Sequence, residues 1–345
     1  MYCCDSLLLR LEATEEVGTV VEAKPAVGGE ELRVPTVVPV TLSEPNVYVL
    51  DMAEYSLDGE PFHEEEEILR LSSICKGKLG WPLCVNVQPW AIPEEPSEHH
   101  VTLRFTIHSE IEAEGVRLAM EEAEWTKIWM NGKEVPTVID GWYTDKCIQT
   151  VTLPKISKGE TILTVDWPLG KRTSLEWCYL LGDFGVRVIG SKKILIPPVR
   201  QLGFGDVTGQ GLPFYGGNIT YHIPYHGEGE LELVASQYRG ALLKVAVDGA
   251  ETGRVVFPPY RLALGHLAQG EHTVDVTLFG TRINTFGQLH YVPYDNIDKY
   301  YHAEGTIWST FWFGPDFWRT TGDAWSYDYQ LHQVGILATP RLIKK

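Results

Sequence analysis

The feature that most constrains the fold is a strand-and-turn pattern that occurs twice. In the first copy, an apolar run ends in the dipeptide Asn131-Gly132, and a run of alternating threonine and aliphatic residues begins at Gly159. In the second copy, Asp248-Gly249 takes the place of the first turn, and a second turn is expected at Gly270. Asn-Gly and Asp-Gly between alternating apolar residues are strong hairpin signals. Because the loops differ in length between the copies, the pattern indicates a repeated β-sandwich fold rather than a tandem array.

Composition limits the class of protein and the class of partner. A chain of 345 residues suits two or three domains. Its hydrophobic content of 44% supplies enough apolar side chains for folded cores. The net charge of −17 argues against nucleic acid and against an anionic membrane surface, since both require clusters of Lys and Arg. A neutral polar ligand fits this charge better.

The cysteines and the N-terminal residues bear on the compartment. No two of the six cysteines form a Cys-x-x-Cys pair, so we expect free thiols in a reducing environment. No stretch approaches the roughly 20 apolar residues of a membrane-spanning helix. Residues 1–11 lack the basic and the long apolar segments of a signal peptide. We therefore predict a cytoplasmic protein.

One helix is predicted, over residues 64–79. Four glutamates lie at its start and two lysines near its end, which suits the helix dipole. Gly80 and Pro82 follow it and would end it. Ile68, Leu71 and Cys75 repeat at steps of three and four residues and would form one buried stripe.

The predicted fold class is all-β, with two antiparallel β-sandwich domains preceded by a short mixed segment that carries the one helix. The predicted parts are an N-terminal β-rich segment with the helix and a linker (1–98), the first sandwich (99–190), a connector (191–213) and the second sandwich (214–345). An aromatic excursion, residues 291–329, lies within the second sandwich. Loops of that length inside a compact domain are usually functional or cover another surface.

A search for catalytic and metal-binding motifs finds none. The sequence has no Gly-x-Ser-x-Gly elbow, no phosphate loop and no dinucleotide fingerprint. His222 and His226 are four residues apart, but Pro224 and the strand context prevent the shared helical face of a zinc pair. We predict no metal site and no cofactor, and we assign no catalytic residue.

Carboxylates leave an enzymatic alternative open. Among 46 acidic residues, some two will lie at the roughly 5–10 Å separation that glycoside hydrolysis uses. Four of them lie beside aromatic residues, as is common in sugar sites: Glu176, Asp183, Asp323 and Asp328. Surface or turn positions are the default expectation for these side chains.

The aromatic residues are the best positive signal for a ligand. Trp and Tyr rings pack on the apolar C–H faces of sugars, while polar neighbours bind the hydroxyls. Trp318 and Trp325 lie in loop-like sequence, so we predict them as a sugar platform, with Asp323 and Tyr327 hydrogen bonding to hydroxyls.

Other tryptophans are weaker candidates for the same role. Trp308 and Trp312 would share one strand face, where a core position is the more usual outcome than a ligand contact. Trp142 and Trp177 of the first sandwich are possible contacts of lower rank.

Four motifs in their order resemble a galactose-binding-like jelly roll. They are residues 214–221, Asp248-Gly249, Gly270-Glu271-His272 and Phe286-Gly287. More specifically, they resemble the sugar-binding-domain type attached to large bacterial glycoside hydrolases of the family 2 and α-L-rhamnosidase-like kind. Residues 49–59 and the following helix are similar to the stretch that joins a preceding domain to the terminal sandwiches. The resemblance covers about residues 45–340 and implies a C-terminal region without the catalytic barrel, so no catalytic residue is carried over.

The predicted function is that of a non-catalytic, carbohydrate-associated accessory region of a glycoside hydrolase. Such a region would bind sugar weakly or pack on a separate catalytic domain or subunit. Two alternatives stay open at this point. One is a free-standing glycoside hydrolase or lyase with a carboxylate pair between the sandwiches, and the other is a protein-interaction or oligomerisation module.

Overall fold

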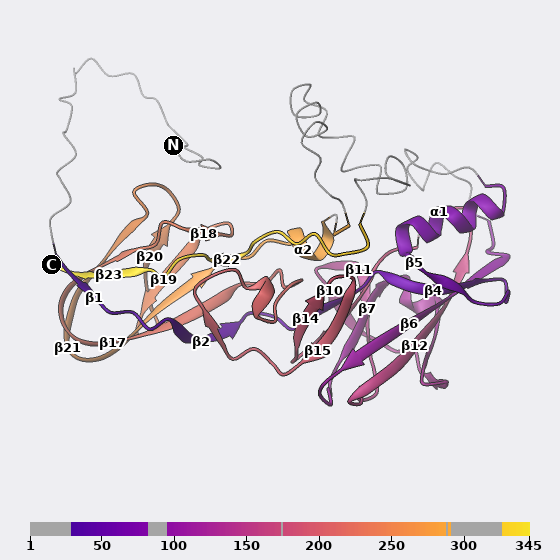
Figure 1. Ribbon diagram of the computed structural model, residues 1–345, viewed down its shortest axis with the longest axis horizontal. Coiled ribbons are helices and arrows are strands. Elements are labelled where there is room, and N and C mark those ends of the chain that lie inside the picture. The colour runs from indigo at the N-terminus through magenta and orange to yellow at the C-terminus, as the bar shows by residue number, and fades with distance from the viewer. Residues whose placement is uncertain (1–28, 82–94, 174, 288, 291–325) are drawn as a thin grey trace, which may run out of the picture.

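A computed structural model describes residues 29–81, 95–173, 175–287, 289–290 and 326–345 (Figure 1). The described chain is mostly β-strand, arranged in several antiparallel sheets with two helices, which confirms the predicted fold class. Its apolar residues divide into two separate cores. Neither helix of the described part has the length and hydrophobicity of a membrane-spanning helix.

Two sheets enclose the first core. The five-stranded sheet has the order β10-β11-β7-β13-β3. Its strands are β3 (Asn46–Leu50), β7 (Arg117–Glu121), β10 (Ile139–Tyr143), β11 (Asp145–Thr152) and β13 (Cys178–Gly182). The facing sheet is built on β6 and β12, which pair antiparallel along their whole lengths. Its strands are β4 (Met52–Leu57), β5 (His63–Glu67), β6 (His99–Ser109), β8 (Lys127–Met130), β9 (Lys133–Val135), β12 (Gly159–Leu169), β14 (Gly185–Ile189) and β15 (Lys192–Ile196).

Alternation of side chains explains this packing. Along β6 every second residue, from Val101 through Leu103 and Phe105 to Ile107, is buried, and the residues between them face outward. A strand of period two buries one face only, so the second sheet must cover that face.

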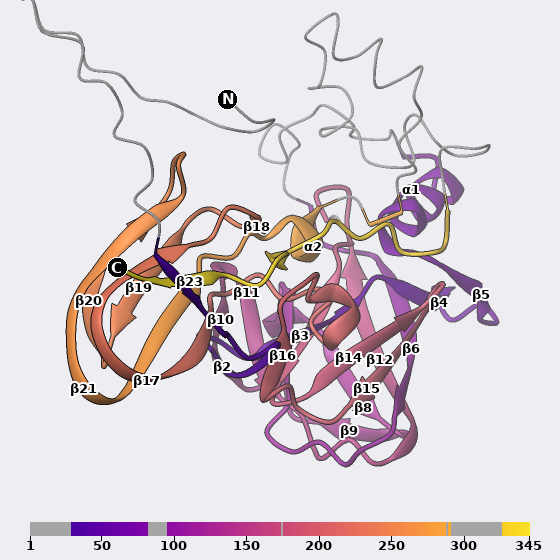
Figure 2. The ribbon, with the colours of Figure 1, turned by 60° about the vertical axis from the view of Figure 1, so that its left-hand side comes forward.

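One curved sheet surrounds the second core. Its longest strands, β17 (Ile219–Val234) and β21 (Arg261–Leu278), pair with each other and bend around the core (Figures 1 and 2). The register of this pair shifts near Gly227 and Gly229, both of which have positive φ. Bulges of this kind bend a strand sharply, which lets one sheet close over itself. The other strands are β1 (Glu30–Leu32), β2 (Val37–Leu42), β16 (Gln201–Gly203), β19 (Leu243–Val247), β20 (Ala250–Val255) and β23 (Arg341–Lys344), with the pair β18 (Tyr238–Arg239) and β22 (Gly335–Ile336) as a separate small sheet.

The two predicted hairpin turns are confirmed. Asn131-Gly132 joins β8 to β9 and Asp248-Gly249 joins β19 to β20. All four residues have positive φ, between 50° and 80°. That is the backbone of the type I′ turn, whose twist matches the twist of the flanking strands.

The second half of the predicted repeat is partly wrong. Gly270 does not form a turn: it lies inside β21, opposite Gly227 of β17. Phe286, from the last of the four motifs, ends the short helix α2 (Ile283–Phe286) and lies in no strand. A glycine between polar residues is a turn signal, but the pairing of β21 with β17 continues through Gly270 and keeps it in a strand.

The predicted helix is confirmed as α1 (Ile68–Lys78), with its first turn corrected. The residues before it form β5 (His63–Glu67), which pairs with β4. Glu67 is the N-cap, since its carboxylate accepts hydrogen bonds from the backbone N–H groups of Leu69 and Arg70. Charge pattern predicts where a helix dipole is favourable, but strand pairing decided where this helix begins.

Strands from the first 60 residues join both cores. Residues 1–98 are predicted as a separate segment, whereas β1 and β2 pair with strands of the second core and β3 and β4 pair with strands of the first. Residues of the predicted connector behave similarly: β15 joins the first core and β16 pairs with β2. The chain therefore crosses between the two sandwiches more than once.

Candidate functional site

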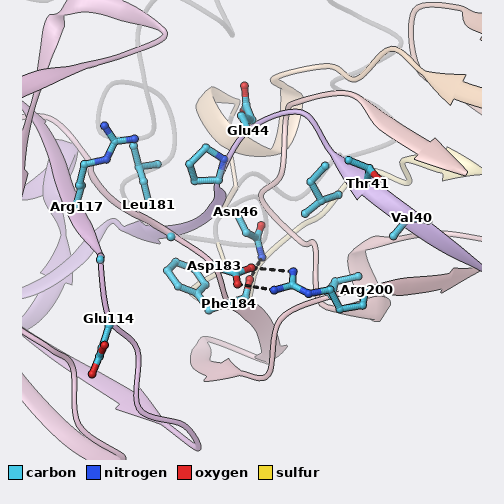
Figure 3. Close-up of a pocket in the computed structure, with 15 residues that line it drawn as sticks. Val40, Thr41, Glu44, Asn46, Glu114, Arg117, Leu181, Asp183, Phe184 and Arg200 are labelled. Atoms are coloured by element: carbon cyan, nitrogen blue, oxygen red, sulfur yellow. Dashed lines mark hydrogen bonds and ion pairs between the residues drawn. The ribbon is translucent and has the colours of Figure 1, made fainter. Parts of the chain in front are cut away.

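A cavity of about 490 Å³ lies where the chain crosses between the sandwiches (Figure 3). One wall comes from β2 of the second sandwich, and the other comes from β7, β13 and the turn after β13 in the first. The polar side chains that line it are Thr41, Glu44, Asn46, Glu114, Arg117, Asp183 and Arg200. This volume lies within the range of small-molecule sites.

One ion pair spans the cavity between the sandwiches. Arg200 donates from Nη1 and Nη2 to Oδ1 and Oδ2 of Asp183, at 2.8 and 2.5 Å (Figure 3). These hydrogen bonds hold the pKa of the Asp183 carboxyl below its ordinary value. Both side chains remain about two thirds exposed, at 67% for Asp183 and 65% for Arg200. The pair is therefore accessible to a ligand and adds little to stability by itself.

Two other lining residues, Asn46 and Glu44, form hydrogen bonds to other residues of the chain. The buried Asn46 side chain donates to the carbonyls of Phe184 and Gly211, at 2.8 and 3.0 Å. Glu44 accepts both arms of Arg282, at 2.5 and 2.7 Å. These groups fix the floor of the cavity rather than offer free hydrogen-bonding capacity.

Two lining side chains have unused capacity. The Arg117 guanidinium makes no hydrogen bond or ion pair within the described ranges, although its charge lowers the pKa of the nearby Asp140 carboxyl. Arg117 sits on β7 opposite Leu181 of β13, so both side chains point from the same sheet face. Glu114 is exposed at the rim.

A second feature is a pair of exposed tryptophans at the end of the first sandwich. Trp125 is 68% exposed in the 3-10 turn Ala123–Trp125, and Trp142 is 55% exposed on the edge strand β10. Gln149 of β11 lies opposite Trp142, and its Oε1 accepts a hydrogen bond from the Glu124 backbone N–H at 3.1 Å. Gln149 thus links the strand that carries one ring to the turn that carries the other. We call Trp125, Trp142 and Gln149 the tryptophan surface.

A third feature is a fully buried charged cluster. The Asp51 carboxylate accepts hydrogen bonds from Lys193 at 2.5 Å, from Tyr329 at 2.7 Å and from His290 at 2.9 Å. Lys193 Nζ also donates to the Val49 carbonyl at 2.6 Å. Burial alone would raise the pKa of Asp51, but the Lys193 charge and the His290 hydrogen bond outweigh burial and hold that pKa well below its ordinary value. All hydrogen-bonding atoms of this carboxylate are occupied, so the cluster is a structural anchor.

Two carboxyls with raised pKa values, the buried Glu67 and the partly buried Glu176, lie near the helix. Burial raises the pKa of Glu67 to about 7, against hydrogen bonds from Trp177 and from the N-terminus of α1. Burial, with the charges of Glu121 and Glu67, raises the pKa of Glu176 to about 8. Trp177, a predicted contact of lower rank, is buried and donates from Nε1 to Glu67 at 2.5 Å, so it is a core residue.

The predicted platform lies almost entirely outside the described residues. Only Tyr327 is described: it is exposed, its hydroxyl donates to both Glu66 oxygens at 3.2 Å, and Arg70 lies 5.9 Å from its ring centroid. The structure does not test Trp308, Trp312, Trp318, Asp323 and Trp325.

The exposure of two tryptophans could not be predicted from the sequence. Trp142 is predicted only as a contact of lower rank, and Trp125 is not among the predicted contacts. Their exposure comes from an edge strand and a 3-10 turn, which strand alternation does not reveal. Glu176 and Asp183 lie on separate features, the acidic group near α1 and the cavity, and do not form a pair.

The histidines noted in the sequence pair with carboxylates. His222 Nδ1 lies 2.7 Å from Asp275, and His226 Nδ1 lies 2.8 Å from Glu271. No group of His, Cys, Asp or Glu side chains within the described ranges has the arrangement of a metal site. Cys75, Cys147 and Cys178 are free thiols.

Comparison with known proteins gives similarity in structure alone. No protein family matches the chain, and no curated protein matches it. A rhamnosidase from a Novosphingobium species is similar over 73% of this chain and 23% of its own, with 17% identity and a TM-score of 0.29. A family 2 β-galacturonidase from Eisenbergiella tayi is similar over 70% of this chain and 37% of its own, with 13% identity and a TM-score of 0.23.

The similarity is not restricted to glycoside hydrolases. An anti-sigma factor domain-containing protein from Clostridium clariflavum is similar over 68% of this chain and 90% of its own, with 10% identity and a TM-score of 0.20. The chain spans between 23% and 37% of the length of the two enzymes. The solved structures that are similar to this chain thus include rhamnosidase and family 2 chains, each matched in part and at a low TM-score.

Proposed function

We propose that this chain is a non-catalytic, carbohydrate-associated region that binds sugar through the tryptophan surface. The observation that carries the proposal is the exposure of two tryptophan rings, one on the edge strand β10 and one in the turn that the Gln149 side chain ties to the neighbouring strand. Isolated exposed apolar residues are common and require no explanation. Exposed aromatic rings near a hydrogen-bonding side chain provide what sugar rings require: apolar faces for C–H groups and a polar group for hydroxyls.

The charge of the chain supports the same ligand class. A net charge of −17 disfavours polyanions and leaves neutral glycans as suitable partners. Binding should be weak, because each stacked ring contributes only about 0.5–1.5 kcal/mol beyond area burial. The proposal includes a separate catalytic domain or subunit as the source of any turnover, and a cytoplasmic location.

Replacing Trp125 and Trp142 together by alanine should weaken binding to a neutral oligosaccharide by about 5- to 140-fold. Two lost stacking contacts amount to roughly 1–3 kcal/mol, and 1.4 kcal/mol corresponds to a tenfold change in affinity. Isothermal titration against a panel of neutral oligosaccharides measures the change. Because both side chains are exposed, the melting temperature should stay within a few degrees.

The matched control for this experiment is Phe257→Ala. Phe257 is an aromatic residue of the second sandwich with comparable exposure, at 41%, and it lies away from the tryptophan surface. Its removal should leave sugar affinity unchanged. Equal affinities for the wild type and the double tryptophan variant would contradict the assignment of the surface.

The platform predicted over Trp318 and Trp325, with Asp323 and Tyr327, stays a further proposal of the same kind. It rests on the composition of that segment. Of these residues the structure describes Tyr327, whose exposed ring lies against Glu66 and Arg70 of the helix region.

A further inference from the structure

We infer that the cavity between the two sandwiches is a second ligand site, for a neutral, hydroxyl-rich molecule of one or two sugar rings. The inference rests on the proposed function for its ligand class, but it uses none of the residues of the tryptophan surface. It assigns a role to a polar cavity that the tryptophan surface does not explain.

The walls of the cavity carry charged side chains of both signs. The described lining brings together two guanidinium groups, Arg117 and Arg200, with three carboxylates, Glu44, Glu114 and Asp183. Arg282, bound to Glu44, adds a third positive charge beside the lining. With Asp140 beside Arg117 also counted, the site has three positive and four negative charges, so it has no positive excess that would attract an anion such as a phosphate. Asp183 and Glu44 are each already paired with a guanidinium group, which reduces their attraction for a cation such as an amine.

The side chains that line the cavity include both hydrogen-bond donors and hydrogen-bond acceptors. A sugar hydroxyl both donates and accepts, so it requires acceptors and donors within reach of one another. Arg117 has donors without a partner inside the described ranges, and Glu114 has exposed acceptors at the rim. Asp183 and Arg200 form a planar pair that is about two thirds exposed, and its outer edges present further acceptors and donors. An anionic group would satisfy only the donors, and a cationic group would satisfy only the acceptors.

The cavity lies between the two sandwiches, and residues of both line it. Val40, Thr41 and Leu42 belong to the second sandwich, whereas Arg117, Leu181 and Gly182 belong to the first (Figure 3). The apolar members, Val40, Leu42, Pro45, Leu181 and Val199, offer contact for the C–H faces of a ring. A ligand here contacts both sandwiches, so binding should stabilise their native arrangement and raise the melting temperature by mass action.

The test uses the Trp125→Ala, Trp142→Ala double variant, which removes the tryptophan surface and leaves the cavity intact. Isothermal titration of this variant with neutral mono- and disaccharides should retain one weak site. Adding Arg117→Gln and Arg200→Gln should then weaken that site at least tenfold, since both guanidinium donors are lost from the cavity. The control Arg187→Gln, which removes an exposed partner of Glu110 outside the cavity, should leave it unchanged.

The outcomes separate this inference from the proposed function. Sugar binding by the wild type that the tryptophan variant loses completely would overturn the cavity site and leave the proposed function standing. Residual binding that the two arginine changes do not weaken would also overturn the cavity site. Tighter binding of a uronic acid or an amino sugar than of the neutral sugar, lost with the arginine changes, would contradict the neutral ligand class. No sugar binding by any form would overturn both proposals.

Discussion

Replacing Asp51 by asparagine should lower the free energy of unfolding by about 3–5 kcal/mol, the usual cost of removing one partner from a buried ion pair. Asp51 is fully buried, and its carboxylate is the counterion of the buried Lys193. The variant keeps the size of the side chain but leaves the ammonium group without a compensating charge. Urea unfolding at pH 7, followed by fluorescence, measures the difference.

Two companion variants make this prediction specific. Asp183→Asn breaks an ion pair that is about two thirds exposed, so it should cost only about 0–1 kcal/mol. The double change Asp51→Asn, Lys193→Met removes both charges and should be less destabilising than Asp51→Asn alone. A loss below about 1 kcal/mol for Asp51→Asn would mean that Lys193 is not desolvated as the structure describes.

The second large expected effect is a change in the free energy of unfolding with pH, caused by the Glu67 carboxyl. Burial raises the pKa of Glu67 from 4.5 to about 7, so between these values the folded protein holds a proton that the unfolded chain releases. The free energy of unfolding therefore falls as pH rises through this window, and the cost is complete above about pH 7. A shift of this size corresponds to about 3 kcal/mol.

Glu67→Gln removes one of the two carboxyls with raised pKa values, leaves Glu176, and should reduce this dependence. The difference in stability between variant and wild type should change by about 3 kcal/mol in favour of the variant between pH 4.5 and pH 8. Glu67→Gln also alters the hydrogen-bond acceptor at the N-cap of α1, which shifts the stability of the variant by a constant amount. Such a constant shift does not affect the change in the difference between the two pH values. Thermal unfolding at a series of pH values measures it.

Trp177→Phe is the matched test of the cause. It removes the Nε1–H donor that binds the Glu67 carboxylate at 2.5 Å and keeps an aromatic ring in the core. Because that hydrogen bond favours the ionised form, its loss should move the window to higher pH. Parallel pH profiles for the wild type and Glu67→Gln would show that Glu67 is not the group responsible.

The elements that depend on residues close together in the sequence, such as tight turns, strand faces and the helix, could be predicted. The turns at Asn131-Gly132 and Asp248-Gly249 require positive φ, which these residue types tolerate, so the dipeptides alone located two hairpins. Alternation along β6 likewise determined which of its faces is buried. The helix was found from its apolar spacing and its glycine stop.

Long-range pairing could not be predicted in the same way. Glu66 and Glu67 look like the first turn of a helix, but pairing with Ala53 and Met52 of β4 keeps them in a strand. Gly270 looks like a turn, but pairing with Gly227 of β17 keeps it inside a strand. In each case a partner distant in sequence overrode a local preference.

The candidate sites depend even more on distant contacts. Asp51, Lys193, His290 and Tyr329 come from four separate parts of the chain, and nothing in their sequence neighbourhoods connects them. The cavity likewise forms only because β2 and β3 belong to different sandwiches. Exposure of Trp142 follows from its place on an edge strand, which becomes known only when the sheet order is known.

One ligand-observed NMR experiment tests the central claim, that the chain binds carbohydrate without turning it over. A panel of intact neutral oligosaccharides is incubated with the purified protein, saturation transfer to the sugar protons is recorded, and the signals of newly formed reducing ends are followed in the same samples. The account predicts saturation transfer to at least one oligosaccharide, its reduction in the Trp125→Ala, Trp142→Ala variant, and no new reducing ends. New reducing ends that a single carboxylate substitution abolishes would show a glycoside hydrolase and would contradict the account, as would the absence of saturation transfer across the panel.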